Sequence, residues 1–158
     1  MKKFNVLFVC LGNICRSPTA DGVFRKYIES AGLADQVHVD SAGTAAWHIG
    51  KSPDPRSTEA AYERGFDLSF LKARQVSEQD FEDFDLLLAM DEDNFQNLMA
   101  IAPDSKTHKV QKLLTLGSLD PTGDVPDPYY GGSDGFERVL DLVEDACAGL
   151  LERIKKDI

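Results

Sequence analysis

The sequence has 158 residues, enough for one folded domain with a sizeable core, so we expect residues 1–158 to form a single domain. Apolar residues make up 42% of the chain and charged residues 28%, which is typical of a water-soluble globular protein. The net charge of −10 disfavours nucleic acid or an anionic membrane surface as a partner.

No stretch of the sequence approaches the ~20 apolar residues of a membrane span. The basic start Met1-Lys2-Lys3 and the apolar residues after it are similar to a secretory signal. However, Asn5 interrupts the apolar run, which falls short of the ~7–15 residues that such a signal needs. The three cysteines, an odd number, do not form a disulfide framework. We therefore expect a cytoplasmic protein that does not bind membranes.

The first half of the chain predicts two strands and two helices. Residues 4–9 are an apolar run of strand length, and residues 18–31 carry apolar residues at the spacing of a half-buried helix that Gly32 ends. Residues 37–39 predict a second short strand. After an irregular stretch over residues 44–54, Pro55 opens a helix to about Glu63.

The second half continues the alternation of strands and helices. Ser77 is a suitable N-cap for a short helix, residues 84–90 predict a strand that is buried on both faces, and Asp91 caps a helix that reaches about Ala100. Residues 110–114 predict a fourth strand and residues 120–132 a long loop. From Ser133 to Ile154 the apolar residues recur with helical spacing.

This alternation predicts an α/β fold, in which a parallel sheet is covered by helices on both faces. Ligands of such folds bind at the carboxyl ends of the strands. Cys10, Ser41, Asp91 and the long loop can all gather at that edge.

Residues 10–17, Cys-Leu-Gly-Asn-Ile-Cys-Arg-Ser, form the turn between the first strand and the first helix. Gly12 and Asn13 both tolerate positive φ, which lets the N–H groups of the turn curl into an anion-binding nest. Ser17 suits the N-cap and Pro18 the first position of the helix, whose positive end then points into the turn.

A cysteine and an arginine in such a turn meet the needs of phosphoryl transfer to sulfur. The helix terminus and Arg16 favour the thiolate of Cys10, which is the nucleophilic form of cysteine. The amide N–H groups and the guanidinium can then hold the outer oxygens of a phosphate.

The sequence from Cys10 to Pro18 resembles the signature of the low-molecular-weight protein tyrosine phosphatases. Three further stretches match that family in order, namely Asp40-Ser41-Ala42-Gly43-Thr44, Met90-Asp91 and Asp127-Pro128-Tyr129-Tyr130-Gly131. The resemblance covers nearly the whole chain. It implies a three-layer fold whose four-stranded parallel sheet has the order 2-1-3-4. It also implies hydrolysis of protein phosphotyrosine and small aryl phosphates through a phosphocysteine intermediate.

Three acids of the long loop, Asp120, Asp124 and Asp127, are candidates to protonate the departing phenol. The prolines on both sides of Asp127 restrict its backbone, which favours it only modestly over the other two. The resemblance assigns to Asp127 the role of general acid and base, beside Cys10 as nucleophile and Arg16 as phosphate clamp.

The remaining expected site residues surround the phosphate and the substrate ring. Those expected to bind substrate are Leu11, Gly12, Asn13, Ile14, Cys15, Ser17, Trp47, Tyr129 and Tyr130. Tyr129 and Tyr130 are expected to line a cleft too deep for phosphoserine, and Trp47 either forms the facing wall or simply packs in the protein.

Several residues are expected to support the turn. Ser17 can donate a hydrogen bond to the sulfur of Cys10, while Asn13 and Ser41 resemble the family's network that holds the turn in shape. Leu71 stands where the family usually has a histidine, so this network is either looser here or closed by another group. Asp91 is interpreted as a helix cap without a catalytic role.

The other cysteines and the histidines have less specific interpretations. Cys15 is either a small core residue or a redox partner that traps an oxidised Cys10, and Cys147 lies on the apolar face of the last helix. The three histidines, His38, His48 and His108, share no ligand spacing, so we expect no metal and no cofactor.

Two alternative functions remain open. A thiol-dependent arsenate reductase of related fold would need a relay of extra cysteines, and a phosphotyrosine-binding module without turnover would not need Cys10, Arg16 and Asp127 together. The expected partners are phosphotyrosine-containing proteins, with the chain acting as a monomer or weak dimer.

Overall fold

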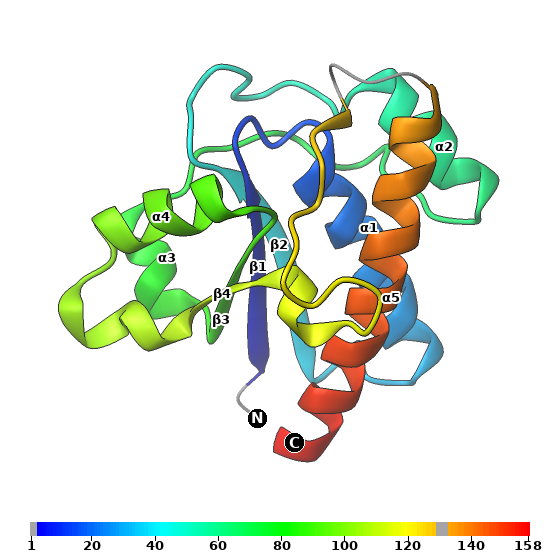
Figure 1. The fold of residues 1–158 in the computed structure, drawn as a ribbon. Helices are drawn as coiled ribbons and strands as arrows, with labels where there is room; N and C mark the ends of the chain where they lie inside the picture. Colours follow the sequence, from blue (N-terminus) through cyan, green and yellow to red (C-terminus); the bar gives the residue numbers. More distant parts are fainter. Residues whose placement is uncertain (1–2, 129–132) are drawn as a thin grey trace.

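The structure is a computed structural model that describes residues 3–128 and 133–158. Within these residues a sheet joins four parallel strands in the order β2-β1-β3-β4 (Figure 1). The strands are β1 (Phe4–Cys10), β2 (Val37–Gly43), β3 (Leu86–Ala89) and β4 (Val110–Lys112). The α/β fold and the strand order are therefore confirmed.

Helices cover both faces of the sheet, which gives three layers (Figure 1). One face carries α1 (Arg16–Ser30), α2 (Pro55–Glu63) and α5 (Ser133–Asp157), and the other carries α3 (Glu78–Asp83) and α4 (Glu92–Ile101). No helix of the described residues, α5 included, is long and apolar enough to cross a membrane.

The pleat of β1 divides the core between the two helical layers. Val6 and Phe8 belong to the apolar cluster under α1 and α5, while Leu7 and Val9 belong to the cluster under α3 and α4. Successive side chains of a strand point to opposite faces, so an unbroken apolar run is what a strand covered on both sides requires.

Local capping explains where three of the helices begin. The Asp54 side chain accepts the N–H of Arg56 at the start of α2, whose first residue is Pro55. Ser77 and Asp80 form a capping box at α3, and Asp91 accepts the N–H of Asn94 at α4. The predicted starts of these helices are confirmed.

Other element ends differ from the prediction. Helix α1 begins at Arg16 with Cys15 as its N-cap, so the assignment of Ser17 and Pro18 to the N-cap and first position is wrong. The reason is that the end of the turn is already helical, because the Thr19 N–H bonds the Cys15 carbonyl. Pro18 still lies in the first turn, where its missing N–H has no partner to lose.

Three segments away from the turn also differ. Strand β3 begins at Leu86 because Phe84 still caps the end of α3. Strand β4 ends early and passes into the short helix η2 (Leu113–Leu116). The short helix η1 (Asp104–Lys109) was not predicted from the sequence.

Candidate active site

The turn after β1 lies at the carboxyl edge of the sheet, beside the ends of β2 and β3. Its carbonyl groups are held from outside, since the N–H groups of Thr44, Ala45 and Asp54 bond the carbonyls of Cys10, Leu11 and Ile14 at 2.7–2.9 Å. Within the described residues, the N–H groups of residues 11, 12, 14 and 15 meet no hydrogen-bond acceptor. The turn therefore offers donors to an anion.

The two residues that tolerate positive φ, Gly12 and Asn13, differ in conformation. Asn13 has a φ of 57°, the left-handed conformation that asparagine tolerates. Gly12 does not adopt positive φ, so the turn uses this conformation at Asn13 and not at Gly12. Gly12 instead leaves room for His48, because a Cβ at position 12 would lie 2.9 Å from His48 Cδ2.

Two hydrogen-bonding groups meet the buried sulfur of Cys10. The backbone N–H of Asn13 donates to Sγ at 3.3 Å, and the hydroxyl oxygen of Ser17 lies 2.9 Å from it. Both groups are therefore placed to hydrogen-bond the sulfur.

The hydroxyl of Ser17 is oriented by Asn13. A backbone N–H only donates, so the bond from the Arg74 N–H to Asn13 Oδ1 at 3.0 Å fixes the orientation of that amide. The Nδ2 group of Asn13 then donates to Ser17 Oγ at 2.8 Å. Because Ser17 accepts there, its own proton is left to the Cys10 sulfur, which is closer than the alternative acceptor, the Ala42 carbonyl at 3.4 Å.

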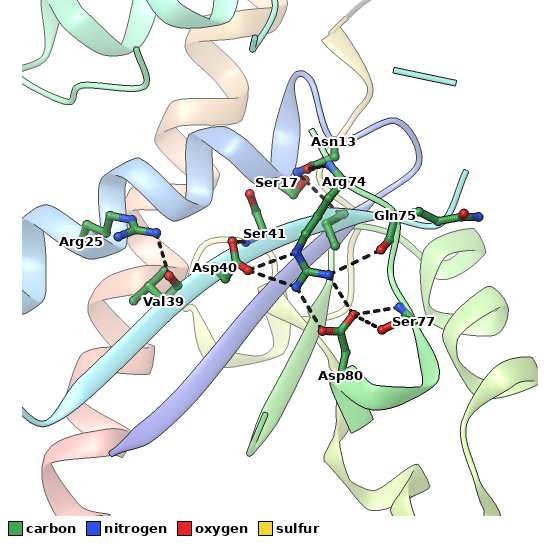
Figure 2. A network of polar contacts seen from close by, with 11 residues as sticks. Asn13, Ser17, Arg25, Val39, Asp40, Ser41, Arg74, Gln75, Ser77 and Asp80 are labelled. Carbon is green, nitrogen blue, oxygen red and sulfur yellow. Dashed lines mark hydrogen bonds and ion pairs between the residues drawn. The ribbon is translucent and has the colours of Figure 1, made fainter. Parts of the chain in front are cut away.

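Arg74 is itself held by an ion cluster (Figure 2). Its guanidinium lies between the carboxylates of Asp40 and Asp80, at 3.0 Å from each. Burial lowers the pKa of Arg74, but these two carboxylates outweigh it, so the pKa is raised overall. The cluster ties the middle of β2 and the first turn of α3 to the segment that orients Asn13.

The structure also answers the question raised by Leu71. Its side chain is buried in the apolar core, and the Arg74 N–H satisfies the Asn13 carbonyl oxygen. The network is thus closed by backbone in this chain. Ser41 reaches this network through its backbone, since its N–H donates to Asp40 Oδ1 at 2.8 Å.

The guanidinium of Arg16 is buried and oriented by two contacts. Its Nη1 group donates to Asp91 Oδ2 at 2.6 Å and to the Val125 carbonyl at 3.0 Å. Burial lowers the pKa of Arg16, whereas the charges of Cys10, Asp91 and Asp127 raise it, with a net increase. Asp91 is a helix cap as expected, but it also orients Arg16, a contact that the sequence analysis missed.

A pocket of about 180 Å³ opens above Cys10. Its lining residues are Cys10, Leu11, Gly12, Ile14, Cys15, Arg16, Trp47, His48 and Asp127. Asp120 and Asp124 are not among them: the Asp120 carboxyl folds over the turn at Gly123, and Asp124 pairs with Lys112. Only Asp127 of the three candidate acids lines this pocket.

The other expected substrate-binding residues occupy different places. Trp47 lines the pocket with 69% of its surface exposed, so it is a wall rather than a core residue. Asn13 and Ser17 lie buried behind the turn, outside the lining. The predictions for Tyr129 and Tyr130 fall outside the described residues. His48 lines the pocket although its sequence context gave no signal.

All three cysteines are free and buried. Burial raises the pKa of Cys15 to about 12, so its thiol is protonated at neutral pH. Burial likewise raises the pKa of Cys147, which lies in the core as expected. No group of three or more potential metal ligands occurs among residues 3–128 and 133–158.

Comparisons with known proteins place this geometry in context. Residues 5–158 match the sequence profile described as low molecular weight phosphotyrosine protein phosphatase. The chain is 43% identical to a low molecular weight protein-tyrosine-phosphatase of Bacillus subtilis, over 97% of both chains.

Two solved structures share the fold over nearly their full length. One is a protein tyrosine phosphatase from Entamoeba histolytica, with a TM-score of 0.95, 40% identity and coverage of 98% of this chain and 99% of that one. The other is a Drosophila arginine phosphatase, with a TM-score of 0.88, 33% identity and complete coverage of both chains.

Proposed function

Because the chain belongs to the low molecular weight phosphotyrosine protein phosphatase family, we propose that it hydrolyses protein phosphotyrosine and small aryl phosphates through a phosphocysteine intermediate. One observation carries the proposal: Cys10, Arg16 and Asp127 line the same pocket, although Asp127 comes from a distant loop. We further propose that residues 1–158 act as one phosphatase domain.

In the first step the Cys10 thiolate attacks phosphorus in line with the departing phenol oxygen. The free N–H groups of the turn and the Nε and Nη2 groups of Arg16 bind the three equatorial oxygens as charge redistributes. The contacts of Arg16 Nη1 with Asp91 and Val125 support this role, since they leave the rest of the guanidinium to the pocket.

Asp127 protonates the phenol oxygen as the phosphorus–oxygen bond breaks, so the leaving group departs neutral. In the second step Asp127 removes a proton from water, which attacks phosphorus and releases Cys10 as thiolate. The Ser17 hydroxyl stabilises that thiolate in both steps.

Phosphotyrosine is the favoured substrate because apolar and aromatic side chains form part of the pocket wall. Leu11, Ile14 and Trp47 suit the face of a phenyl ring better than a charged guanidinium. Since one structural relative is an arginine phosphatase, the comparison of phosphotyrosine with phosphoarginine is the informative one.

The nucleophile is tested with Cys10→Ser. We expect this variant to lose turnover of phosphotyrosine peptides by more than about 10⁴-fold while it still binds phosphate, because only the attacking sulfur is removed. Stopped assays and phosphate titration measure the two quantities. Wild-type activity in Cys10→Ser would contradict the proposal. Faster hydrolysis of phosphoarginine than of phosphotyrosine by the wild type would contradict it as well.

The acid is tested with Asp127→Asn on aryl phosphates of graded leaving ability. We expect kcat/KM to fall by about 10²-fold or more for a basic phenol and much less for an acidic phenol, which departs without a proton. A uniform decrease over all leaving groups assigns the proton donor elsewhere.

Reduction of arsenate with thioredoxin would instead support the reductase alternative.

A further inference from the structure

We propose that Lys112 and Asp124 form a positioning pair that aims Asp127 at Cys10. Neither residue lines the pocket above Cys10, and both act through the segment that leads to Asp127. This inference rests on the proposed function, because it concerns the delivery of the proton by Asp127.

The pair joins the segment that leads to Asp127 to strand β4 of the sheet and to helix α4. Lys112, the last residue of β4, places Nζ 2.5 Å from Asp124 Oδ1. The same oxygen accepts the backbone N–H of Glu92, the first residue of α4, at 3.1 Å. Asp124 therefore binds both a cation and the positive end of a helix, which gives its carboxylate one defined position.

The next residue of the loop is fixed independently. The N–H of Val125 donates to the Met90 carbonyl at 2.8 Å, its carbonyl accepts Arg16 Nη1 at 3.0 Å, and its side chain is fully buried. These contacts hold the chain at Val125. Asp124 supplies the second point of attachment, and two points define the direction in which the chain leaves toward Asp127.

The prolines at positions 126 and 128 stiffen the backbone around Asp127, so the direction of the chain at Val125 determines where Asp127 lies. Each proline fixes its own φ and restricts the residue before it, so few backbone rotations remain between Val125 and Asp127. A change in the direction of the chain at Asp124 is therefore transmitted to the Asp127 carboxyl.

Because the pair is partly exposed, its removal should affect the position of Asp127 more than the stability of the whole protein. The side chain of Lys112 is 16% exposed and that of Asp124 is 47% exposed. An ion pair this close to solvent contributes little to global stability. The hydrogen bond to Asp124 raises the pKa of Lys112 and outweighs partial burial, so the lysine stays charged throughout the working range.

The test compares Lys112→Met, Asp124→Asn and the double variant with the wild type on aryl phosphates of graded leaving ability. The readout is kcat/KM, which reports the step that expels the phenol. We expect a decrease of about three- to tenfold for a basic phenol and less than about twofold for an acidic phenol, a partial version of the loss in Asp127→Asn. The double variant should lose no more than the worse single variant, because the two residues act as one unit.

Lys112→Arg should restore the wild-type pattern, since it keeps the charge beside Asp124. The matched control is Lys155→Met, which removes an exposed lysine paired with Glu152 near the end of α5. It should leave kcat/KM unchanged for both the basic and the acidic phenol. If kcat/KM decreases equally for all phenols, or decreases in neither Lys112→Met nor Asp124→Asn, the inference is overturned while the proposed function stays intact. If Asp127→Asn itself lacks the leaving-group dependence, the acid assignment fails and the inference fails with it.

Discussion

At the scale of single residues, the environment of the Cys10 sulfur depends on the direction of one amide. Asn13 reaches Ser17 with its Nδ2 group only because the Arg74 N–H occupies its oxygen. The sequence predicted the conformation of Asn13 and the contact of Ser17 with Cys10, since both depend on neighbours within the turn. It did not predict Arg74 as the orienting group.

A buried carboxyl of α1 yields a pH prediction at this scale. Asp21 is fully buried, and its Oδ2 has no hydrogen-bond partner among the described residues. Burial raises the pKa of Asp21 above its ordinary value, and the contact with Arg25 does not reverse this. The folded state then holds the proton more tightly than the unfolded state, so stability decreases as pH rises from 3.8 through the pKa of the folded state.

Asp21→Asn removes this decrease. The free energy of unfolding of the variant should therefore improve relative to the wild type as pH rises, by about 1.4 kcal/mol for each unit by which the pKa is raised. Urea unfolding at several pH values measures it. Asp67→Asn is the control of opposite sign, because hydrogen bonds with Ser69 lower the pKa of Asp67. If the free energy of unfolding of the wild type instead rises relative to that of Asp21→Asn as pH rises, the ion pair with Arg25 outweighs the effect of burial.

At the scale of elements, the ends of the helices follow local chemistry, whereas their docking depends on distant groups. Arg64, just after α2, contacts three carboxylates of α5: Glu137 at 2.8 Å, Asp141 at 3.0 Å and Glu144 at 2.6 Å. These acids share one face of the helix and repel one another. Burial lowers the pKa of Arg64, but the three carboxylates raise it overall.

Arg64→Gln should therefore destabilise the protein. We expect a loss of about 1 kcal/mol in the free energy of unfolding at low salt, because the cation is removed and the repulsion within α5 remains. The loss should shrink in 1 M NaCl, where the Debye length falls to about 3 Å. Arg153→Gln, which removes an α5 arginine bonded to the neutral Gln111, should change little. A loss that is independent of salt would point to packing of the arginine stem instead.

At the scale of the whole molecule, the net charge of −10 opposes the approach of a phosphorylated substrate. The attraction comes from the turn, the α1 terminus and Arg16, all within one pocket. Substrates whose surroundings are basic should therefore associate best.

This field predicts opposite salt effects for two phosphotyrosine peptides of equal length. For a peptide with acidic flanks, kcat/KM should rise a few-fold as the Debye length shortens from about 30 Å at 0.01 M to about 8 Å at 0.15 M ionic strength. For one with basic flanks it should fall. Steady-state assays measure kcat/KM for both peptides as a function of ionic strength. An uncharged crowding agent serves as the control for viscosity. The same slope for both peptides would show that the local pocket, not the overall charge, governs association.

The sequence by itself determined the features that depend on short stretches of chain. The turn between β1 and α1, the caps at Asp54, Ser77 and Asp91, and the alternation of strands and helices all follow from residues a few positions apart. The resemblance supplied the strand order, which periodicity does not encode.

Only the tertiary structure decided which distant groups serve the turn. Arg16 meets Asp91 across 75 positions and the Val125 carbonyl across 109, and Asn13 meets the Arg74 N–H across 61. It also separated Asp127 from two similar acids and brought His48 into the pocket. These contacts exist because parallel strands in the order β2-β1-β3-β4 bring the carboxyl ends of separate segments to one edge, a proximity that no local pattern in the chain records.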